Sequence, residues 1–294
     1  MSSTYRTTCN QCGGSNNVVW NNDGHSYCYN CGAYQGKSTA EVKIVKRSPH
    51  IKLIREFYAE LSEAYHKNLR DEHYIWLFKR GISEHSIKTL KIGYCGDGYI
   101  PLYASKIVTE SGIYYNSHIT HKGRIVFPFI SEYGVTDIWS RSITADDTVK
   151  YKGCFSPAFR RGSDYMYMHD ACYKPDAHKR IVHTEGIIKA VIANQYGIPC
   201  IATPGTLSNR PGTTPLAGQE QIICFDNQID HRRELITAIK RRAEQYINPK
   251  IATLPLRGNS KADIDQYILQ FGIDDFKRVI ENAPDYEVWK QLVK

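Results

Sequence analysis

Two hydrophobic runs in the second half of the chain each lead to a carboxylate. Residues 181–182 are followed shortly by Glu185, and residues 222–225 run directly into Asp226. Between these runs, residues 187–196 carry apolar side chains at helical spacing. A strand, a helix and a strand in this order predict a parallel sheet, because a parallel crossover needs a helix's length of chain.

The carboxyl ends of neighbouring parallel strands lie at one rim of a sheet, and ligands of open parallel sheets gather there. Glu185 and Asp226 are therefore expected to lie close together. Two carboxylates at such a rim suit Mg²⁺, a hard cation that takes oxygen ligands and keeps waters for phosphates. The alternative for this stretch is an ordinary doubly wound domain whose strand ends are acidic.

The rest of the hydrophobic pattern divides the chain into helical and strand-like segments. Helical spacing of apolar residues alternates with stretches of period two, and turn residues separate them. The pattern predicts helices over 51–92, a hairpin of strands at 123–129 and 135–143, a strand at 199–203, a helix over 235–246, a strand at 251–254 and a helical tail over 271–292.

Four of the nine cysteines form two C-x2-C pairs that are fifteen residues apart: Cys9, Cys12, Cys28 and Cys31. This spacing predicts a zinc ribbon, because each pair supplies two thiolates to one tetrahedral site. A segment this small has little core, so zinc binding would supply its folding free energy. Redox-active pairs are the alternative. The five other cysteines are scattered, which favours a reducing compartment over a disulfide framework.

Inside the predicted ribbon, residues 18–20 and 26–27 read as two strands joined by an Asn-Asn-Asp-Gly turn. Four side chains in this region are candidates for an outward-facing surface: Trp20, Asp23, His25 and Tyr29. The alternative is a turn aspartate, a solvated histidine and a small core built on Trp20 and Tyr27.

Lys and Arg outnumber Asp and Glu by 38 to 30, a formal charge of +8. This balance favours a polyanionic partner, and 21 tyrosines suit base stacking as well as packing. Between Lys43 and Gly93 there are eleven Lys or Arg against six acidic residues. That run is either a solvated helix face or a groove along a nucleic-acid backbone. The chain has no apolar run of 18 residues and no signal-peptide core, so no membrane association is expected.

Three parts of the sequence resemble DNA primases. Glu-Gly at one strand end and Phe-Asp at a later one resemble the TOPRIM core shared by bacterial primases and topoisomerases. CNQCGG with NDGHSYCYNC resembles the zinc-binding domain of phage primase–helicases, whose Asp-Gly-His segment reads template bases; the resemblance implies this role for Asp23 and His25. YIWLFKRGISEHSIKTLKIGYC resembles the segment that opens the primase polymerase domain, and Arg80 matches its Arg-Gly-Ile-Ser as a DNA contact.

The same resemblance implies further site residues. A Phe-Pro strand, a Gly turn, a strand with Arg and then Lys-Tyr-Lys resemble the part of the primase core that holds the nucleoside triphosphate. The implied nucleotide-binding residues are Arg124, Arg141, Lys150 and Lys152. KADID resembles the third acidic element of the family, which implies catalytic roles for Asp263 and Asp265 alongside Glu185 and Asp226.

The sequence departs from the family at two acidic positions. The family's Asp-x-Asp reads Asp226-Asn227-Gln228 here, so the second carboxylate is missing. Gln228 could ligate Mg²⁺ through its carbonyl oxygen, or Asp230 could take the role although it is equally suited to be a helix N-cap, or the site binds metal poorly. Lys189 stands where the family often has Asp.

Together these features predict an α+β/α/β multidomain protein, a zinc ribbon followed by a mixed α/β primase core with a TOPRIM parallel sheet. The expected parts are a ribbon at 1–36, a linker at 37–50, a basic helical part at 51–110, a β-rich part at 111–175, the TOPRIM part at 176–256 and an acidic motif with a helical tail at 257–294. Glu185, Asp226 and Asp263 are the expected ligands of Mg²⁺ or Mn²⁺.

The expected function is that of a stand-alone, phage-type primase, which makes RNA primers from NTPs on single-stranded DNA in the cytoplasm, with a replicative helicase and a DNA polymerase as partners. Two alternatives stay open. One is a zinc-dependent DNA-binding module with a degenerate TOPRIM fold that recruits replication proteins, and the other is a TOPRIM nuclease.

Overall fold

The structure is a computed structural model of the 294-residue chain. It describes the backbone of four N-terminal strands and of the first helix from Pro49, and in full the residues 55–96, 121–131, 134–144, 150–153, 167–168, 179–203, 219–229 and 233–293.

The N-terminal strands form one antiparallel sheet in the order β1 (Tyr5–Thr7), β2 (Val18–Trp20), β3 (Ser26–Cys28) and β4 (Tyr34–Gln35). The two strands predicted inside the ribbon are confirmed as β2 and β3, which pair antiparallel. The zinc ligands lie outside the described residues, since Cys9, Cys12 and Cys31 are not described and Cys28 is described only in its backbone. The same holds for the predicted outward-facing surface of the ribbon: Asp23, His25 and Tyr29 lie outside the described residues, and so does the side chain of Trp20.

Three helices and an antiparallel sheet follow. The elements are α1 (Pro49–Lys67), α2 (Asp71–Lys79), α3 (Glu84–Thr89), β5 (Gly93–Cys95), β6 (Arg124–Ser131), β7 (Gly134–Ser142) and β8 (Tyr151–Gly153). The strands pair antiparallel in the order β5-β6-β7-β8. The helices predicted over 51–92 and the predicted hairpin are confirmed. Strand β5 was not predicted, because three residues are too few for a periodic signal.

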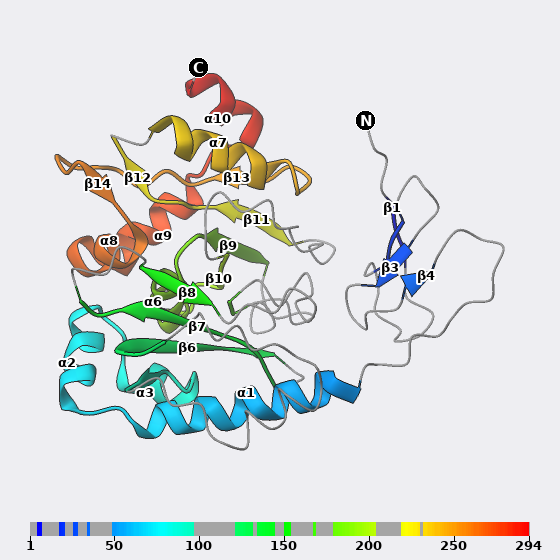
Figure 1. The fold of residues 1–294 in the computed structure, drawn as a ribbon. Coiled ribbons are helices and arrows are strands. Elements are labelled where there is room, and N and C mark those ends of the chain that lie inside the picture. The colour runs from blue at the N-terminus through cyan, green and yellow to red at the C-terminus, as the bar shows by residue number, and fades with distance from the viewer. Residues whose placement is uncertain are drawn as a thin grey trace.

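Helix α1 lies along one face of this sheet (Figure 1). Its buried side chains follow the 3.6 period, and they pack against sheet residues that include Val126 and Ile138; they are Phe57, Tyr58, Leu61 and Tyr65. Helix and sheet approach so closely that a Cβ added at Gly93 would lie 2.5 Å from the carbonyl carbon of Tyr65. Only glycine fits there, and this contact fixes where α1 sits on β5.

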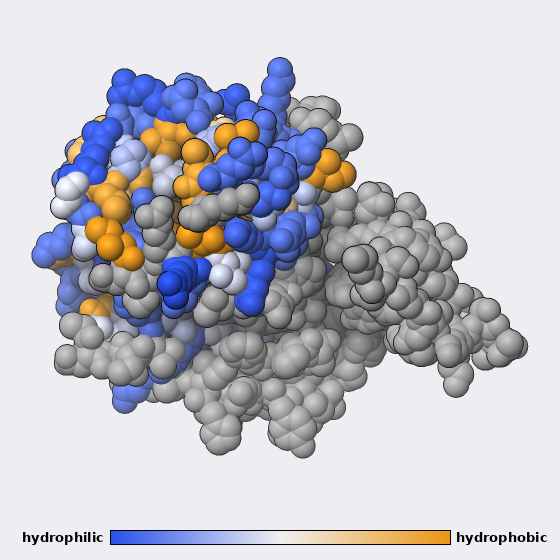
Figure 2. All heavy atoms as spheres, turned by 90° about the horizontal axis from the view of Figure 1, so that it is seen from above, coloured by the Kyte–Doolittle hydropathy of each residue, from blue (hydrophilic) through white to orange (hydrophobic). Residues whose placement is uncertain are grey.

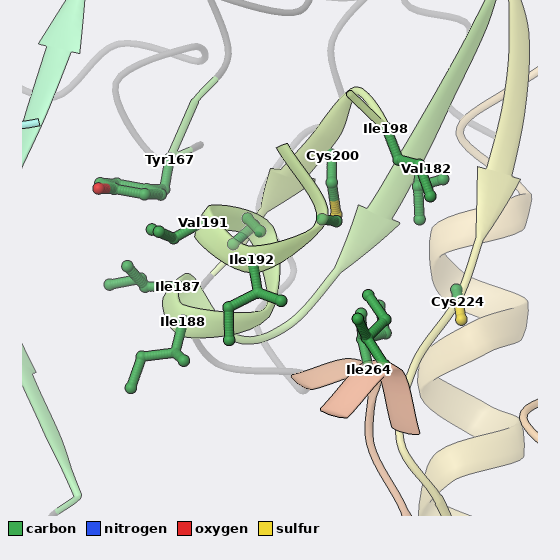
Figure 3. Close-up of a cluster of buried hydrophobic side chains, with 14 of the residues drawn as sticks. Tyr167, Val182, Ile187, Ile188, Val191, Ile192, Ile198, Cys200, Cys224 and Ile264 are labelled. Carbon is green, nitrogen blue, oxygen red and sulfur yellow. The ribbon is translucent and has the colours of Figure 1, made fainter. Parts of the chain in front are cut away.

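The predicted parallel sheet is confirmed. Its strands are β9 (Arg180–Thr184), β10 (Cys200–Ala202), β11 (Glu220–Ile223) and β13 (Lys250–Ile251), in the order β10-β9-β11-β13 with every pair parallel. Helix α6 (Ile187–Gln195) covers one face and lies between the two sheets, while α7 (Arg232–Ala243) packs on the other face (Figure 1). Figure 3 shows the cluster on the α6 side, where Val191 of α6 lies toward Tyr167, and Ile192 of α6, Val182 of β9 and Ile264 belong to the same cluster.

The C-terminal part adds a two-stranded ladder and three helices. These are β12 (Asn227–Gln228), β14 (Lys261–Ala262), α8 (Ile264–Phe271), α9 (Ile273–Glu281) and α10 (Tyr286–Leu292). The predicted helical tail is confirmed as α9 and α10, the strand predicted at 251–254 shrinks to β13, and α8 was not predicted. Seen from the side of α7 and α10, the surface carries mainly hydrophilic side chains with separate hydrophobic patches (Figure 2).

The Arg-Gly-Ile-Ser segment joins the helical part to the parallel sheet. Gly81 has a φ of +83°, which favours glycine, and a Cβ there would lie 2.9 Å from Cδ2 of Leu269 in α8. The amide of Gln195, at the end of α6, donates to the carbonyl of Gly81 at 2.9 Å and accepts from the Ser83 N–H at 2.7 Å. Within the described residues, no helix is long and apolar enough to cross a membrane.

Candidate active site at the rim of the parallel sheet

Two of the predicted catalytic carboxylates meet at the carboxyl edge of the parallel sheet. Strands β9 and β11 are neighbours with Ile223 opposite His183, so Glu185 and Asp226 leave the sheet side by side. The backbone N–H of Asp226 lies 3.4 Å from Oε1 of Glu185, and the hydroxyl of Thr184 donates to its Oε2 at 3.2 Å. The strand-end pattern therefore brings these two groups together as predicted.

The third acidic element reaches the same rim through the β12–β14 ladder. Asn227 pairs with Ala262 and Gln228 with Lys261, so the register places Asp226 opposite Asp263. Directly opposite residues of an antiparallel pair are about 5 Å apart between Cα atoms. The short ladder thus brings a segment remote in sequence to the end of β11.

Asp263 also begins helix α8. Its Oδ1 accepts a hydrogen bond from the N–H of Gln266 at 3.1 Å, the contact of an N-cap. Asp265 lies in the first turn of the same helix and is 4% exposed. The KADID segment is therefore both a helix start and the second half of the acidic rim.

Two lysines are interleaved with the carboxylates. The Nζ atom of Lys189, from the first turn of α6, contacts Oε1 of Glu185 and Oδ1 of Asp226. The Nζ atom of Lys261, from β14, lies 3.0 Å from Oδ2 of Asp226 and 3.3 Å from Oδ2 of Asp263. One continuous row of contacts therefore runs from Glu185 to Asp263, with cations and anions alternating.

Burial and the charge of Lys189 shift the pKa values of Glu185 and Asp226 in opposite directions. Burial raises the pKa of Glu185 to about 7; the Lys189 ammonium lowers it in part, and the charge and hydrogen bond of Asp226 raise it further. Burial also opposes the charged form of Asp226, but the Lys189 ammonium and hydrogen bonds outweigh it and lower its pKa to about 2. Desolvation disfavours the charged form of Lys189, yet the two carboxylates raise its pKa above the usual range.

The second pair is divided in the same manner. Asp263 and Asp265 share a side-chain hydrogen bond. Burial, followed by the negative charge of Asp263, raises the pKa of Asp265 to about 7. Burial also works against the charged form of Asp263, but the hydrogen bond from Asp265 and the Lys189 charge lower its pKa overall. Near neutral pH the rim therefore holds carboxyls poised to gain or lose a proton, a property typical of active sites.

The antiparallel sheet presents Arg141 and Tyr151 toward this rim. They are opposite one another across β7 and β8, and Nη1 of Arg141 donates to the Tyr151 hydroxyl at 2.7 Å. Burial raises the pKa of Tyr151, and the charges of Arg141, Lys189 and Asp265 also act on its hydroxyl. A guanidinium thus lies on the side of the sheet that faces the acidic rim.

Strand alternation places two other predicted nucleotide-binding residues on the opposite face of the antiparallel sheet. Arg124 and Lys152 have the opposite parity to Arg141 in the paired ladder, so they belong to the face that α1 covers. Arg124 is 2% exposed, and it donates to Oγ of Ser140 at 3.1 Å and to the carbonyl of Lys150 at 2.7 Å. Its guanidinium holds β6, β7 and β8 together. The side chain of Lys150, just before β8, is exposed.

Three further predicted residues lie elsewhere. Gln228 is half-buried in β12, two residues beyond Asp226, while Asp230 lies outside the described residues. Arg80 caps the end of α2, with its guanidinium carbon 5.2 Å from the centroid of the Trp76 ring. A cation stacked on a ring beside a basic helical segment is compatible with nucleic-acid contact.

The rim fits a magnesium ion held by few protein ligands. Among the residues that the structure describes, no group of three or more His, Cys, Asp or Glu side chains is arranged to hold a metal, since the lysines keep the carboxylates in pairs. Mg²⁺ is often held by only one or two carboxylates, with waters and substrate phosphates completing its shell. Asp263 and Asp265, which already share a hydrogen bond, fit that pattern.

By its architecture the chain is a mixed α/β protein with an acidic centre at the rim of a parallel sheet. No family model matches it. It is 25% identical over 224 residues to the DNA primases of Neisseria meningitidis serogroups A and B, a match that covers 70% of this chain. The chain spans 37% of the length of these relatives.

Solved structures extend the likeness to the fold. The DnaG primase catalytic domain bound to single-stranded DNA superposes with a TM-score of 0.60 at 19% identity, over 80% of this chain and 83% of that one. The Aquifex aeolicus primase, with its zinc-binding and RNA polymerase domains, gives 0.59 at 16% identity over 96% of this chain and 79% of the other. The chain thus has the fold of the DnaG catalytic core and is similar in sequence to bacterial primases.

Sequence reasoning missed three participants in the site. Lys189 was noted only as a departure from the family, Lys261 was not noted, and Tyr151 was passed over between two lysines. A lysine four residues after Glu185 on a predicted helix is a usable signal, because side chains at i and i+4 meet. Lys261 could not be found, since its place depends on the β12–β14 pairing.

Proposed function

We propose that the chain is a DNA primase, an enzyme that joins ribonucleotides into short RNA primers on a single-stranded DNA template. One observation carries the proposal. Carboxylates from three separate segments converge at one rim of a DnaG-type fold, at Glu185, Asp226 and Asp263. Placing largely buried carboxylates together is costly because they lose their hydration, and the two lysines between them offset only part of their negative charge.

The reaction is the in-line attack of a 3′-hydroxyl on the α-phosphate of the next nucleotide. It requires the growing negative charge to be balanced and the two nucleotides to be positioned, with little covalent chemistry by the protein. Asp263, with Asp226 or Asp265, would hold a divalent ion at the rim, and that ion would supply the charge compensation. Zn²⁺ would be held by the four ribbon cysteines.

The protein's own groups position the nucleotide. Arg141 is fixed by the Tyr151 hydroxyl on the face toward the rim, so its remaining N–H groups can donate to the phosphates of the incoming triphosphate. Lys150 directly precedes Tyr151 and is exposed, so its ammonium could contact another phosphate of the same triphosphate. Arg124, predicted for the same task, would act through the strands that carry Arg141, whereas Lys152 lies on the opposite face and would not hold the triphosphate.

The template is proposed to be single-stranded DNA, the ligand of one solved primase catalytic domain with this fold. The basic run between Lys43 and Gly93, with Arg80 stacked on Trp76, would hold it by phosphates and stacking. The ribbon would read template bases through Asp23 and His25. A replicative helicase and a DNA polymerase are the proposed partners.

The test is incorporation of labelled NTPs by the purified chain on a panel of short single-stranded templates, with Mg²⁺ and with Mn²⁺. We expect template-dependent RNA products. Salt-sensitive DNA binding without any incorporated nucleotide would instead favour the DNA-binding module, which the amide at Gln228 and the ammonium at Lys189 support. Strand cleavage without an NTP requirement would favour a nuclease.

A further inference from the structure

Lys189 lies in the first turn of helix α6, a position that the helix dipole makes unfavourable for a cation. It is the third residue of α6, whose N-cap is Gly186, and cations near a helix N-terminus are disfavoured by the helix dipole. Its side chain is only 12% exposed. Ordering and burying an ammonium at this end of a helix is costly, so other contacts must hold it there.

Two carboxylates hold it. The Nζ atom contacts Oε1 of Glu185 and Oδ1 of Asp226, whose side chains are 13% and 15% exposed. Glu185 and Asp226 follow the neighbouring strands β9 and β11 at the acidic rim. A metal ion that bridges two carboxylates lies between one oxygen of each. The ammonium occupies that position.

The chain also makes room for the lysine stem. A Cβ added at Gly186 would lie 2.9 Å from Cδ and 3.0 Å from Cε of Lys189, closer than side-chain contacts normally are. The φ of Gly186 is −113°, so its backbone conformation does not require glycine. The absence of a side chain at Gly186 leaves this space to the stem of Lys189.

Lys261 differs in the same row of contacts. It is 44% exposed and lies 3.0 Å from Asp226 and 3.3 Å from Asp263, so it can turn toward solvent when another cation arrives. Lys189 is enclosed and cannot leave without exposing two buried carboxylates to one another. A metal ion can therefore displace the ammonium group beside Asp263 but not the one beside Glu185.

Charge counting leads to the same result. Once Lys261 has turned away, four ionised carboxyl groups and the Lys189 ammonium leave the rim with a charge of −3, most of which one divalent ion offsets; without Lys189 the charge would be −4, which two divalent ions balance. We infer that Lys189 is a built-in cation that replaces one of two divalent ions, so that the rim binds a single ion on the side of Asp263. This inference deepens the proposed function, because it sets how many ions would serve nucleotide transfer.

The test is electron paramagnetic resonance of Mn²⁺ added to the zinc-loaded full chain. Two Mn²⁺ ions at a two-metal site lie about 4 Å apart and give a spin-coupled spectrum, whereas a single ion gives an isolated one. We expect the isolated spectrum for the wild type. Lys189→Met removes the charge at similar length, and it should bind one more Mn²⁺ per chain and show the coupled spectrum.

Three further variants make the result specific. Lys189→Arg keeps the charge and should match the wild type. Lys88→Met removes the exposed lysine of another i,i+4 pair, with Glu84, and should change nothing. Adding Glu185→Gln to Lys189→Met should abolish the extra ion. Circular dichroism checks folding, and Lys189→Gln serves in place of the methionine variant if that variant does not fold.

A coupled spectrum in the wild type would overturn the inference, and so would equal Mn²⁺ stoichiometry and affinity in the wild type and both uncharged variants. These measurements involve no nucleotide incorporation. If the Mn²⁺ counts come out as expected and no RNA is made on any template, the proposed function fails and the inference about Lys189 stands.

Discussion

The wild type should become less stable as the pH rises from about 4 to 7.5, and replacing Asp265 by asparagine should abolish this decrease. Burial, together with the charge of Asp263, raises the pKa of Asp265 from 3.8 to about 7 in the folded chain. Between these values the unfolded chain loses the proton while the folded chain keeps it. The folded state therefore binds more protons, and its free energy of unfolding falls as the pH rises through this window.

The magnitude follows from the size of the shift. One pKa unit corresponds to 1.36 kcal/mol, so a shift of about three units amounts to about 4 kcal/mol. Asp265 is 4% exposed, so little of this is screened by solvent. This contribution is absent below about pH 4, is fully developed above about pH 7.5 and then stays constant. Asparagine resembles the neutral acid, and it can still donate a hydrogen bond to Asp263.

The assay is urea denaturation followed by tryptophan fluorescence, in buffer without divalent ions, at intervals from pH 4.5 to 8.5. Asp265→Asn should equal the wild type at the acid end and exceed it by up to about 4 kcal/mol at the alkaline end. Asp274→Asn is the control, because Asp274 is a 90% exposed aspartate on α9. Parallel pH profiles for the wild type and Asp265→Asn would refute the reasoning.

Three other predictions follow from the structure. Gly93→Ala should destabilise the chain by about 2 kcal/mol or more in urea denaturation, since the new Cβ would lie 2.5 Å from the backbone of Tyr65, whereas Gly96→Ala, with open space around it, should be neutral. Arg141→Met should raise the KM for NTPs in primer synthesis about tenfold, because the triphosphate loses one charge-assisted hydrogen bond. Lys152→Met, on the other face of the sheet, is the control and should change the KM little. Mn²⁺ affinity should rise between pH 6 and 8, because Asp265, with a pKa of about 7, must lose its proton to bind metal; a pH-independent affinity would contradict this value.

Much of the parallel sheet could be predicted from the sequence, because its signals are local. A buried strand, a helix and a second strand leave a continuous hydrophobic pattern, and the carboxyl ends of parallel strands share one rim. Glu185 and Asp226 could therefore be placed together. The hairpin of β6 and β7 was predictable for the same reason, since both strands alternate and a turn separates them.

The remainder of the site depends on pairings that leave no local pattern. Strands β12 and β14 have two residues each, too few for any periodicity, yet their register brings Asp263 to Asp226. Strand parity likewise decides that Arg141 faces the rim and Arg124 does not, and that parity depends on the register of the hairpin. The lysine contacts of the rim follow only once these pairings are in place.

The most direct test of the central claim is nucleotide incorporation by Asp226→Asn on single-stranded DNA. Asp226 contacts both lysines of the rim and is the residue at which β11 meets the β12–β14 ladder. The variant should fold, as circular dichroism would show, and should lose at least about 100-fold in rate, the scale on which groups that stabilise transition-state charge act. Primer synthesis at the wild-type rate by folded Asp226→Asn would contradict the claim that this acidic rim carries the chemistry.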